Sequence, residues 1–203
     1  MKRISVVIVA YNEEENIESV LKKIPSNYEI IIVDDYSSDS TALIANKYAN
    51  VLKNPENLGY EKSLKKCLLH ASGNIIITMD ADGEHDPNDI KRLLKFMNNY
   101  DFVIGERSQL PRISEYFMAW LVRRIIPRIK DPVNGFRVIK KEVIQSIKLD
   151  NMCFGANLLI RAYRKGFKIR TVKIQTKRRL RARIKFSAIL KPILLLIKEV
   201  LIG

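Results

Sequence analysis

Apolar runs alternate with amphipathic segments through the first half of the chain. Four short runs rich in β-branched residues, at 4–10, 29–33, 74–79 and 101–105, are typical of strands buried on both faces. Apolar residues at helical spacing predict helices between them, at 13–23, 38–47, 60–71 and 88–98. This alternation predicts an α/β fold in which helices flank a mostly parallel central sheet, with ligands at the carboxyl ends of the strands.

The C-terminal residues 186–202, FSAILKPILLLIKEVLI, predict an amphipathic helix with a wide apolar face. Ser187, Lys191 and Lys198 fall on one side of it, and Pro192 is expected near its start. A basic segment, KRRLRARIK at 177–185, precedes the helix. An apolar face beside a cationic cluster favours a helix that lies on an anionic membrane. Packing of the same helix on the domain or on a partner subunit is the alternative.

The positive charge of the chain is concentrated near its C-terminal end. The formal net charge is +14, yet 14 of the 36 Lys and Arg residues and only one of the 22 Asp and Glu residues, Glu199, follow residue 160. Such a block attracts an anionic partner, whether phosphate, nucleic acid or a membrane surface. Tyr and Phe do not interleave with the basic residues as a base-stacking platform requires, so nucleic acid is not an expected partner.

Length and composition predict one ordinary domain in a reducing compartment. A chain of 203 residues with 47% hydrophobic content can bury a real core. Its two cysteines, Cys67 and Cys153, make no disulfide framework. The apolar run after Lys2 and Arg3 ends at Tyr11 without a cleavage site, and no apolar stretch reaches the ~18 residues of a spanning helix. We therefore expect a cytoplasmic protein that associates peripherally with the membrane.

The stretch ITMDADGEHDP, residues 77–87, places carboxylates directly behind a predicted strand. Asp80 and Asp82 are two positions apart, which puts both on one side of an extended chain. Carboxylates this close repel unless a cation lies between them, and hard oxygen ligands suit Mg²⁺ or Mn²⁺. A calcium EF-hand loop is excluded because its sixth and twelfth residues would be His85 and Lys91. The alternative is an acidic turn in which Asp86 caps a helix.

The usual nucleotide-binding motifs are missing from the sequence. The first turn, AYNEEE, lacks the glycines of a dinucleotide fingerprint, and no Gly-Lys-Ser/Thr of a P-loop occurs. A dehydrogenase or an ATPase is therefore not expected. A diphosphate bound without a glycine loop needs another neutralising group, and a metal held by Asp80 and Asp82 provides one.

An ordered set of motifs resembles family 2 glycosyltransferases, in particular the branch of dolichol-phosphate mannosyltransferases and polyprenyl-phosphate glycosyltransferases. The motifs run from about residue 4 to about residue 185: VVIVAYNEEENI, IIVDDYSSDST, NPENLGY, IITMDADGEHDP, VIGERS, DPVNGFRV and AYRKGFKIRTVKI. The resemblance implies a GT-A (Rossmann-like) nucleotide-sugar-binding fold over residues 1–176. Residues 177–203 are then a basic segment and a membrane-associating helix.

The resemblance also implies roles for individual side chains. The nucleotide-sugar pocket would be lined by Tyr11, Glu13, Asp34, Asp35, Asp80 and Ala81. The metal ligands would be Asp80, Asp82 and Glu84, of which Glu84 replaces the Gln usual in the family. The acceptor phosphate would be bound by Arg107, Arg137, Arg179 and Lys185, and the catalytic residues would be Asp82 and Arg107. Beside these roles, Asn12 and Ser37 or Ser38 are predicted to cap the first two helices.

The implied reaction moves a sugar from a nucleoside diphosphate sugar, of the GDP-mannose or UDP-glucose type, to a polyprenyl (dolichyl) phosphate with inversion. A phosphate monoester is already ionised near neutral pH and needs no catalytic base, which agrees with Asn157 at a position where relatives carry an acid. Transfer to a glycan or another hydroxyl is the alternative, with Asp131, Asp86 or Glu106 as the base. A third hypothesis is a nucleotide-sugar-binding protein with impaired catalysis.

The resemblance is weakest where it concerns the acceptor. Ala182 and Ile184 replace an expected Gly and Ser in the basic segment. A second acceptor arginine is not evident between Gly105 and Asp131, and the substitutes available there are Arg112, Arg123 and Arg124.

Overall fold

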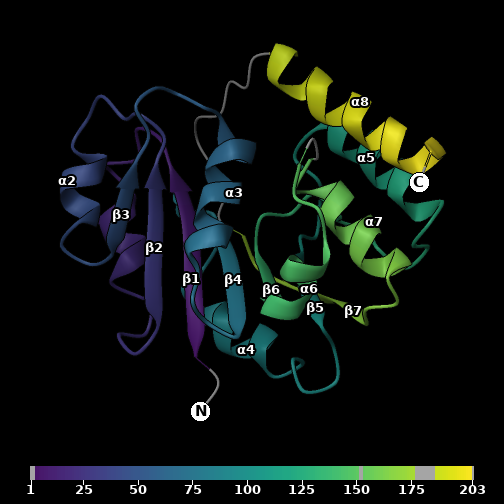
Figure 1. Ribbon diagram of the computed structural model, residues 1–203, viewed down its shortest axis with the longest axis horizontal. Coiled ribbons are helices and arrows are strands. Elements are labelled where there is room, and N and C mark those ends of the chain that lie inside the picture. Colours follow the sequence, from purple (N-terminus) through teal and green to yellow (C-terminus); the bar gives the residue numbers. More distant parts are fainter. Residues whose placement is uncertain (1–2, 151–152, 177–185, 203) are drawn as a thin grey trace.

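A seven-stranded sheet forms the centre of the structure (Figure 1). The computed structural model describes residues 3–150, 153–176 and 186–202. The strands are β1 (Ile4–Ala10), β2 (Glu29–Asp34), β3 (Asn50–Lys53), β4 (Ile75–Asp80), β5 (Phe102–Glu106), β6 (Arg137–Lys140) and β7 (Ile169–Lys173). Their order is β3-β2-β1-β4-β6-β5-β7, and β6 runs antiparallel to β4 and β5. The remaining pairs are parallel, which confirms the predicted mostly parallel sheet.

Helices cover both faces of the sheet because successive strand residues point to opposite sides. Val7 and Ile76 enter one apolar cluster, and Ile8 and Ile77 enter the other. The second cluster is covered by α1 (Ile17–Leu21), α2 (Thr41–Ala45) and α4 (Ile90–Leu94), which follows the short 3₁₀ turn η1 (Pro87–Asp89). The first is covered by α3 (Tyr60–His70), α5 (Ile113–Arg123), α6 (Lys141–Ser146), α7 (Ala156–Arg164) and α8 (Phe186–Ile202).

Three of the four predicted helices are shorter than their patterns indicated. α1, α2 and α4 each have five residues and continue as turns with hydrogen bonds three residues apart, such as Ile24 N to Leu21 O and Met97 N to Leu94 O. The expected caps were also wrong, since Asn16 and Ser40 occupy the cap positions of α1 and α2 and neither side chain makes a capping bond.

The tail helix α8 packs on the domain with one face. It lies across α5 and α7 (Figure 1), where Leu196 is fully buried and Glu199 contacts α7. The opposite face exposes Leu190, Leu194 and Leu201. Pro192 lies inside the helix and not near its start, so its nitrogen donates no bond to the preceding turn. No helix among the described residues has the length and apolar character needed to cross a bilayer.

Candidate functional site

The acidic clusters meet at one edge of the sheet because β1, β2 and β4 are adjacent and parallel. In the register of the strands, Ala10 pairs with Asp34 on one side of β1 and Val9 pairs with Asp80 on the other. The residues that follow, Tyr11 to Glu13, Asp35 and Ala81 to Asp82, therefore leave the sheet together at its carboxyl edge, where α/β folds bind ligands. The structure brings the predicted donor and metal residues to one place.

Hydrogen bonds join the turn after β1 to the turn after β2. Asn12 has a left-handed backbone (φ 53°), its N–H donates to Ser37 Oγ (2.9 Å), and its side-chain Oδ1 accepts from the Ser38 N–H (2.8 Å). The N–H of the buried Glu13 donates to Thr41 Oγ1 (2.7 Å). Asn12 thus fastens the turn after β1 to the turn after β2, in place of the helix cap predicted for it.

Two tyrosine side chains are exposed at this edge of the sheet. Tyr11 is 49% exposed at the end of β1, and Tyr36 is 59% exposed after β2 with a left-handed backbone (φ 71°). A non-glycine residue in this conformation is uncommon and marks a position worth functional attention. Sequence reasoning singled out Tyr11 and missed Tyr36, although Tyr36 lies within the motif IIVDDYSSDST.

The adjacent carboxylates Asp34 and Asp35 differ in their hydrogen-bond partners. Asp35 is buried, and its carboxylate accepts four bonds of 2.8–2.9 Å, which come from Asn54 Nδ2, Ser63 Oγ and the N–H groups of Leu58 and Gly59. Asp34 is equally buried, but it accepts only the Ser37 N–H (3.3 Å) through Oδ2, and its Oδ1 has no partner among the described residues. A buried acceptor without a donor costs about 1–3 kcal/mol. Asp35 therefore secures the loop 54–59, and Asp34 keeps an oxygen available for a ligand.

The loop after β4 is organised around Asp80. Its backbone N–H donates to His85 Nδ1 (3.3 Å), and the same ring nitrogen lies 3.5 Å from Asp80 Oδ2. His85 is 3% exposed, packs on Phe136 at 5.2 Å and forms a bridge with Thr176. Gly135 approaches from the turn before β6, and a Cβ there would lie 2.7 Å from Asp80 Oδ1. His85 and Gly135 thus set the position of Asp80, and both lie in quoted motifs whose roles the sequence did not reveal.

The same loop offers oxygen ligands for a divalent metal. Ala81 is buried, Gly83 takes the left-handed backbone (φ 75°), and Asp82 Oδ1 accepts the Glu84 N–H (3.0 Å). The carboxylates of Asp80 and Asp82 are the hard donors that Mg²⁺ and Mn²⁺ prefer. Within the described parts of the chain, no three ligand side chains already lie close enough to hold an ion. The residues fit a metal whose remaining ligands come from elsewhere, such as a diphosphate.

Arg107 directly follows β5, and two carboxylates bind its guanidinium. Its Nε and Nη2 donate to Asp131 Oδ2 (2.7 Å) and Oδ1 (2.9 Å), and Nη2 also donates to Glu115 Oε2 (2.8 Å). Burial opposes the charged form, but the hydrogen bonds and charges of Asp131 and Glu115 outweigh it and raise the pKa of Arg107. Burial raises the pKa of Glu115. Asp131 is 1% exposed and bound to this arginine, so it is not placed as a free base.

Of the other predicted acceptor residues, the structure describes Arg137, whose side chain is committed to the scaffold. Arg137 is 2% exposed and donates to the carbonyls of Asn134 (2.7 Å), Pro132 (3.3 Å) and Phe154, so it supports the loop that carries Gly135. Burial lowers the pKa of Arg137. Arg179 and Lys185, like Ala182 and Ile184, lie outside the described residues.

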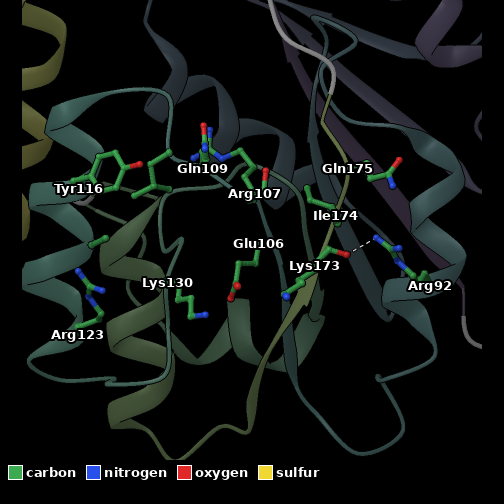
Figure 2. Close-up of a pocket in the computed structure, with 13 residues that line it drawn as sticks. Arg92, Glu106, Arg107, Gln109, Tyr116, Arg123, Lys130, Lys173, Ile174 and Gln175 are labelled. Atoms are coloured by element: carbon green, nitrogen blue, oxygen red, sulfur yellow. Dashed lines mark hydrogen bonds between the residues drawn. The ribbon is translucent and has the colours of Figure 1, made fainter.

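The two remaining candidate bases differ in their surroundings. Asp86 Oδ1 accepts the Asn88 N–H (3.1 Å) and caps η1 as predicted. Glu106 is buried at the end of β5 and lines one cavity of about 600 Å³ together with Arg107 (Figure 2). Asn157, at the position where relatives carry an acid, is buried on α7 against α8, where its Nδ2 donates to Leu195 O (3.1 Å) and Glu199 Oε2 (3.2 Å) and so fixes the tail helix.

Residues 5–147 match the family described as Glycosyl transferase family 2. A dolichol-phosphate mannosyltransferase of Pyrococcus furiosus is 32% identical over 89% of this chain, and the match spans 58% of that relative. An undecaprenyl-phosphate 4-deoxy-4-formamido-L-arabinose transferase of Proteus mirabilis is 33% identical over 53% of this chain and 37% of its own.

Solved structures show the same fold. Glucosyl-3-phosphoglycerate synthase of Mycobacterium tuberculosis, solved with phosphoglyceric acid, superposes with a TM-score of 0.84 at 23% identity, covering 100% of this chain and 81% of that one. The same synthase has also been solved with Mn²⁺ and UDP-glucose. The predicted GT-A fold is confirmed, and the chain belongs to glycosyl transferase family 2.

Proposed function

We propose that this chain transfers a hexose from a nucleoside diphosphate sugar, of the GDP-mannose or UDP-glucose type, to a polyprenyl phosphate at the cytoplasmic membrane surface. The reaction is metal-dependent and inverts the anomeric centre. The observation that carries the donor half is the buried, unpartnered Oδ1 of Asp34 beside the Asp80–Asp82 loop. An N–H or O–H of the nucleoside satisfies that oxygen, and the exposed rings of Tyr11 and Tyr36 lie on the turns that follow β1 and β2.

The metal-binding residues are Asp80 and Asp82, with Glu84 as a third candidate. When bound, the cation supplies positive charge against the diphosphate that leaves. The chain's own part is to hold the Asp80 backbone N–H through His85 Nδ1 and to leave room beside the Asp80 carboxylate through the missing side chain of Gly135. The mycobacterial synthase solved with Mn²⁺ and UDP-glucose supports this assignment by analogy of fold.

The acceptor half is supported by Arg107 and by the contacts that occupy two of the three candidate bases. A phosphate monoester is a nucleophile near neutral pH without proton removal, and Asp131 and Asp86 are both held in other contacts. Glu106, the third candidate, lines the same cavity as Arg107. Nη1 of Arg107 makes no hydrogen bond to any described residue, so it remains able to donate to a phosphate oxygen. The bridge from His85 to Thr176 places the residue before the basic segment at the metal loop. The acceptor-phosphate roles of Arg179 and Lys185, which lie outside the described residues, remain part of the proposal.

Membrane association is supported by an exposed apolar surface on neighbouring helices. We define the α5–α8 surface by residues that are 42–89% exposed, namely Ile113, Phe117, Trp120, Leu190, Leu194 and Leu201. Phe117 stacks on Trp120, and the Arg124 guanidinium lies 4.5 Å from the Trp120 ring. Exposed apolar side chains beside cations suit an anionic lipid surface. A lipid phosphate would then be presented close to the acceptor side of the sheet.

The test is sugar transfer from a panel of nucleotide sugars with Mg²⁺ or Mn²⁺, then with chelator, with and without a short polyprenyl phosphate. We expect transfer that requires both the metal and the lipid phosphate. Asp82→Asn should abolish it, and Asp86→Asn, a carboxylate of the same loop with a capping role, should leave most of it. Transfer to a glycan alone would establish the hydroxyl-acceptor alternative. Binding of a nucleotide sugar without any transfer would indicate impaired catalysis.

The membrane component is tested by cosedimentation with anionic vesicles. Removal of α8 would open the core at Leu196, so point changes on its outer face are the better probe. Leu194→Glu and Trp120→Glu should release the protein from vesicles. Leu43→Glu is the matched control, because Leu43 is 69% exposed on α2, on the other face of the sheet. Equal vesicle binding by all three variants would refute the lipid-facing assignment.

A further inference from the structure

Tyr60 is an exposed aromatic residue at the same edge of the sheet as the acidic motifs. It is the last residue of the motif NPENLGY and the first residue of α3. This helix leads from the end of β3 back to the start of β4 and covers β1 and β2 (Figure 1). Its first residue therefore lies at the carboxyl edge, where Asp34 and Asp80 end their strands. Tyr60 is 41% exposed there, so its ring is open to a ligand.

The backbone on both sides of Tyr60 is fixed by hydrogen bonds. Before it, the Asp35 carboxylate accepts the N–H of Gly59 (2.9 Å). After it, Glu61 Oε2 accepts the N–H of Phe154 (2.8 Å), which lies just before α7. Gly59 has a left-handed backbone (φ 83°), and a Cβ on it would meet no heavy atom within 4 Å. Tyr60 is thus held in place beside open space.

The hydroxyl of Tyr60 lies within electrostatic reach of the metal loop. Burial is the largest cause that raises the pKa of Tyr60, the negative charge of Asp80 raises it further, and the charge of Arg137 lowers it. The phenol therefore stays protonated near neutral pH and can both donate and accept a hydrogen bond. Among the described residues, none forms a hydrogen bond with this hydroxyl. The side chain combines an open ring with a neutral polar group that is available to a ligand.

The position of Tyr60 matches that of the group which the proposed reaction transfers. The charge of Asp80 acts on Arg107 as well as on Tyr60, so both side chains lie around the end of β4. A sugar that passes from a diphosphate at the Asp80–Asp82 loop to a phosphate at Arg107 must cross this region. A phosphate is bound best by cations, and Tyr60 is neutral. An aromatic ring with a polar tip suits the apolar C–H face and the hydroxyls of a hexose.

We propose that Tyr60 binds the hexose of the nucleotide sugar and contributes to the choice of hexose. The ring packs on the C–H face of the pyranose, and the phenol hydroxyl forms a hydrogen bond with one sugar hydroxyl. Hexoses differ in the direction of their hydroxyls, and a fixed polar partner discriminates against a sugar that leaves it unpaired. This inference rests on the proposed function, because it concerns the sugar half of the proposed donor.

Calorimetric titration of the full chain with Mg²⁺ tests the proposal, with UDP-glucose and GDP-mannose as probes and UDP and GDP as their sugar-free counterparts. Tyr60→Ala should weaken the preferred nucleotide sugar by about tenfold or more and change the affinity for its nucleoside diphosphate by less than about twofold. Tyr60→Phe, which loses only the hydroxyl, should weaken the nucleotide sugar by about three- to tenfold. Tyr163→Ala is the matched control, because Tyr163 is 44% exposed on α7 and has no part in the site.

The sugar-free ligands separate this inference from the proposed function. Equal losses for the nucleotide sugar and the nucleoside diphosphate in Tyr60→Ala would overturn the inference, since Tyr60 would then act on the diphosphate or on the fold. Unchanged affinity for the nucleotide sugar in Tyr60→Ala would overturn it as well. Full affinity in Tyr60→Phe would overturn the hydroxyl contact. A wild-type chain that binds neither UDP nor GDP would overturn the proposed function, and the inference with it.

Discussion

Alanine substitution of Asp35 should lower stability, whereas alanine substitution of Asp34 should weaken ligand binding, although the two residues are adjacent and equally buried. Asp35 accepts four hydrogen bonds that hold the loop 54–59, and Asp34 accepts one long bond and leaves Oδ1 unpartnered. Asp35→Ala leaves four hydrogen-bond donors without their acceptor. Asp34→Ala removes a buried carboxylate for which the described residues provide one long hydrogen bond. Comparing the two variants therefore distinguishes a carboxylate that holds the fold from a neighbouring one that binds the ligand.

The magnitudes follow from the number of contacts. A hydrogen bond to a charged group contributes about 1.5–3 kcal/mol, but bonds that share one carboxylate are not additive and single substitutions rarely exceed about 5 kcal/mol. We therefore expect Asp35→Ala to lower the free energy of unfolding by about 4 kcal/mol and Asp34→Ala to change it by less than about 1 kcal/mol. Loss of one charge-assisted bond to the nucleoside should weaken nucleotide affinity in Asp34→Ala by about 10- to 100-fold.

Urea unfolding measures the stabilities, and calorimetric titration with UDP and GDP in the presence of Mg²⁺ measures the affinities. Asp39→Ala serves as a third variant, because the Asp39 carboxylate accepts bonds from Thr41 and from the Glu14 N–H and not from the loop 54–59. If Asp35→Ala unfolds at the wild-type urea concentration, the loop does not depend on its carboxylate. If Asp34→Ala binds the preferred nucleotide as tightly as the wild type, the free oxygen has a different purpose.

Three further predictions concern the rest of the fold. Burial alone would raise the pKa of Asp101, but hydrogen bonds led by that of Lys140 Nζ (2.6 Å) lower it. The stabilisation that Asp101 provides is therefore present above its unfolded pKa of ~4 and is lost as pH falls through its folded pKa. In urea titrations, the free energy of unfolding of Asp101→Asn should fall less steeply with acidification than that of the wild type. An identical dependence of stability on pH in the two proteins would contradict this. Glu199→Gln should lower the free energy of local opening of α8 by about 2 kcal/mol, because Arg161 Nε loses the carboxylate 2.9 Å away. Amide hydrogen exchange in α8 should then be faster than in the wild type. Unchanged exchange would be inconsistent with a stabilising contact. Burial raises the pKa of Cys67 to about 12, so iodoacetamide should label it far more slowly in the folded chain than in urea, and equal rates would show that the thiol is accessible.

The first half of the fold could be predicted because its signals are local. The four apolar runs became β1, β2, β4 and β5, and their carboxyl ends carry the acidic motifs, as the alternation of strands and helices requires. The second half depended on distant pairing. β6 is four residues long and is stabilised by antiparallel bonds to β4 and β5, which no local pattern records.

The sequence by itself determined the fold class, the family and the set of charged residues at the sheet edge, because these follow from hydrophobic periodicity and ordered motifs. Only the tertiary structure decided what each charged group does. Asp35 and Arg137 belong to the scaffold, Asp34 keeps an oxygen without a partner among the described residues, and Glu106 lines a cavity with Arg107. The physical reason is that a carboxylate or a guanidinium acts through the partners that surround it, and those partners come from segments far apart in the chain.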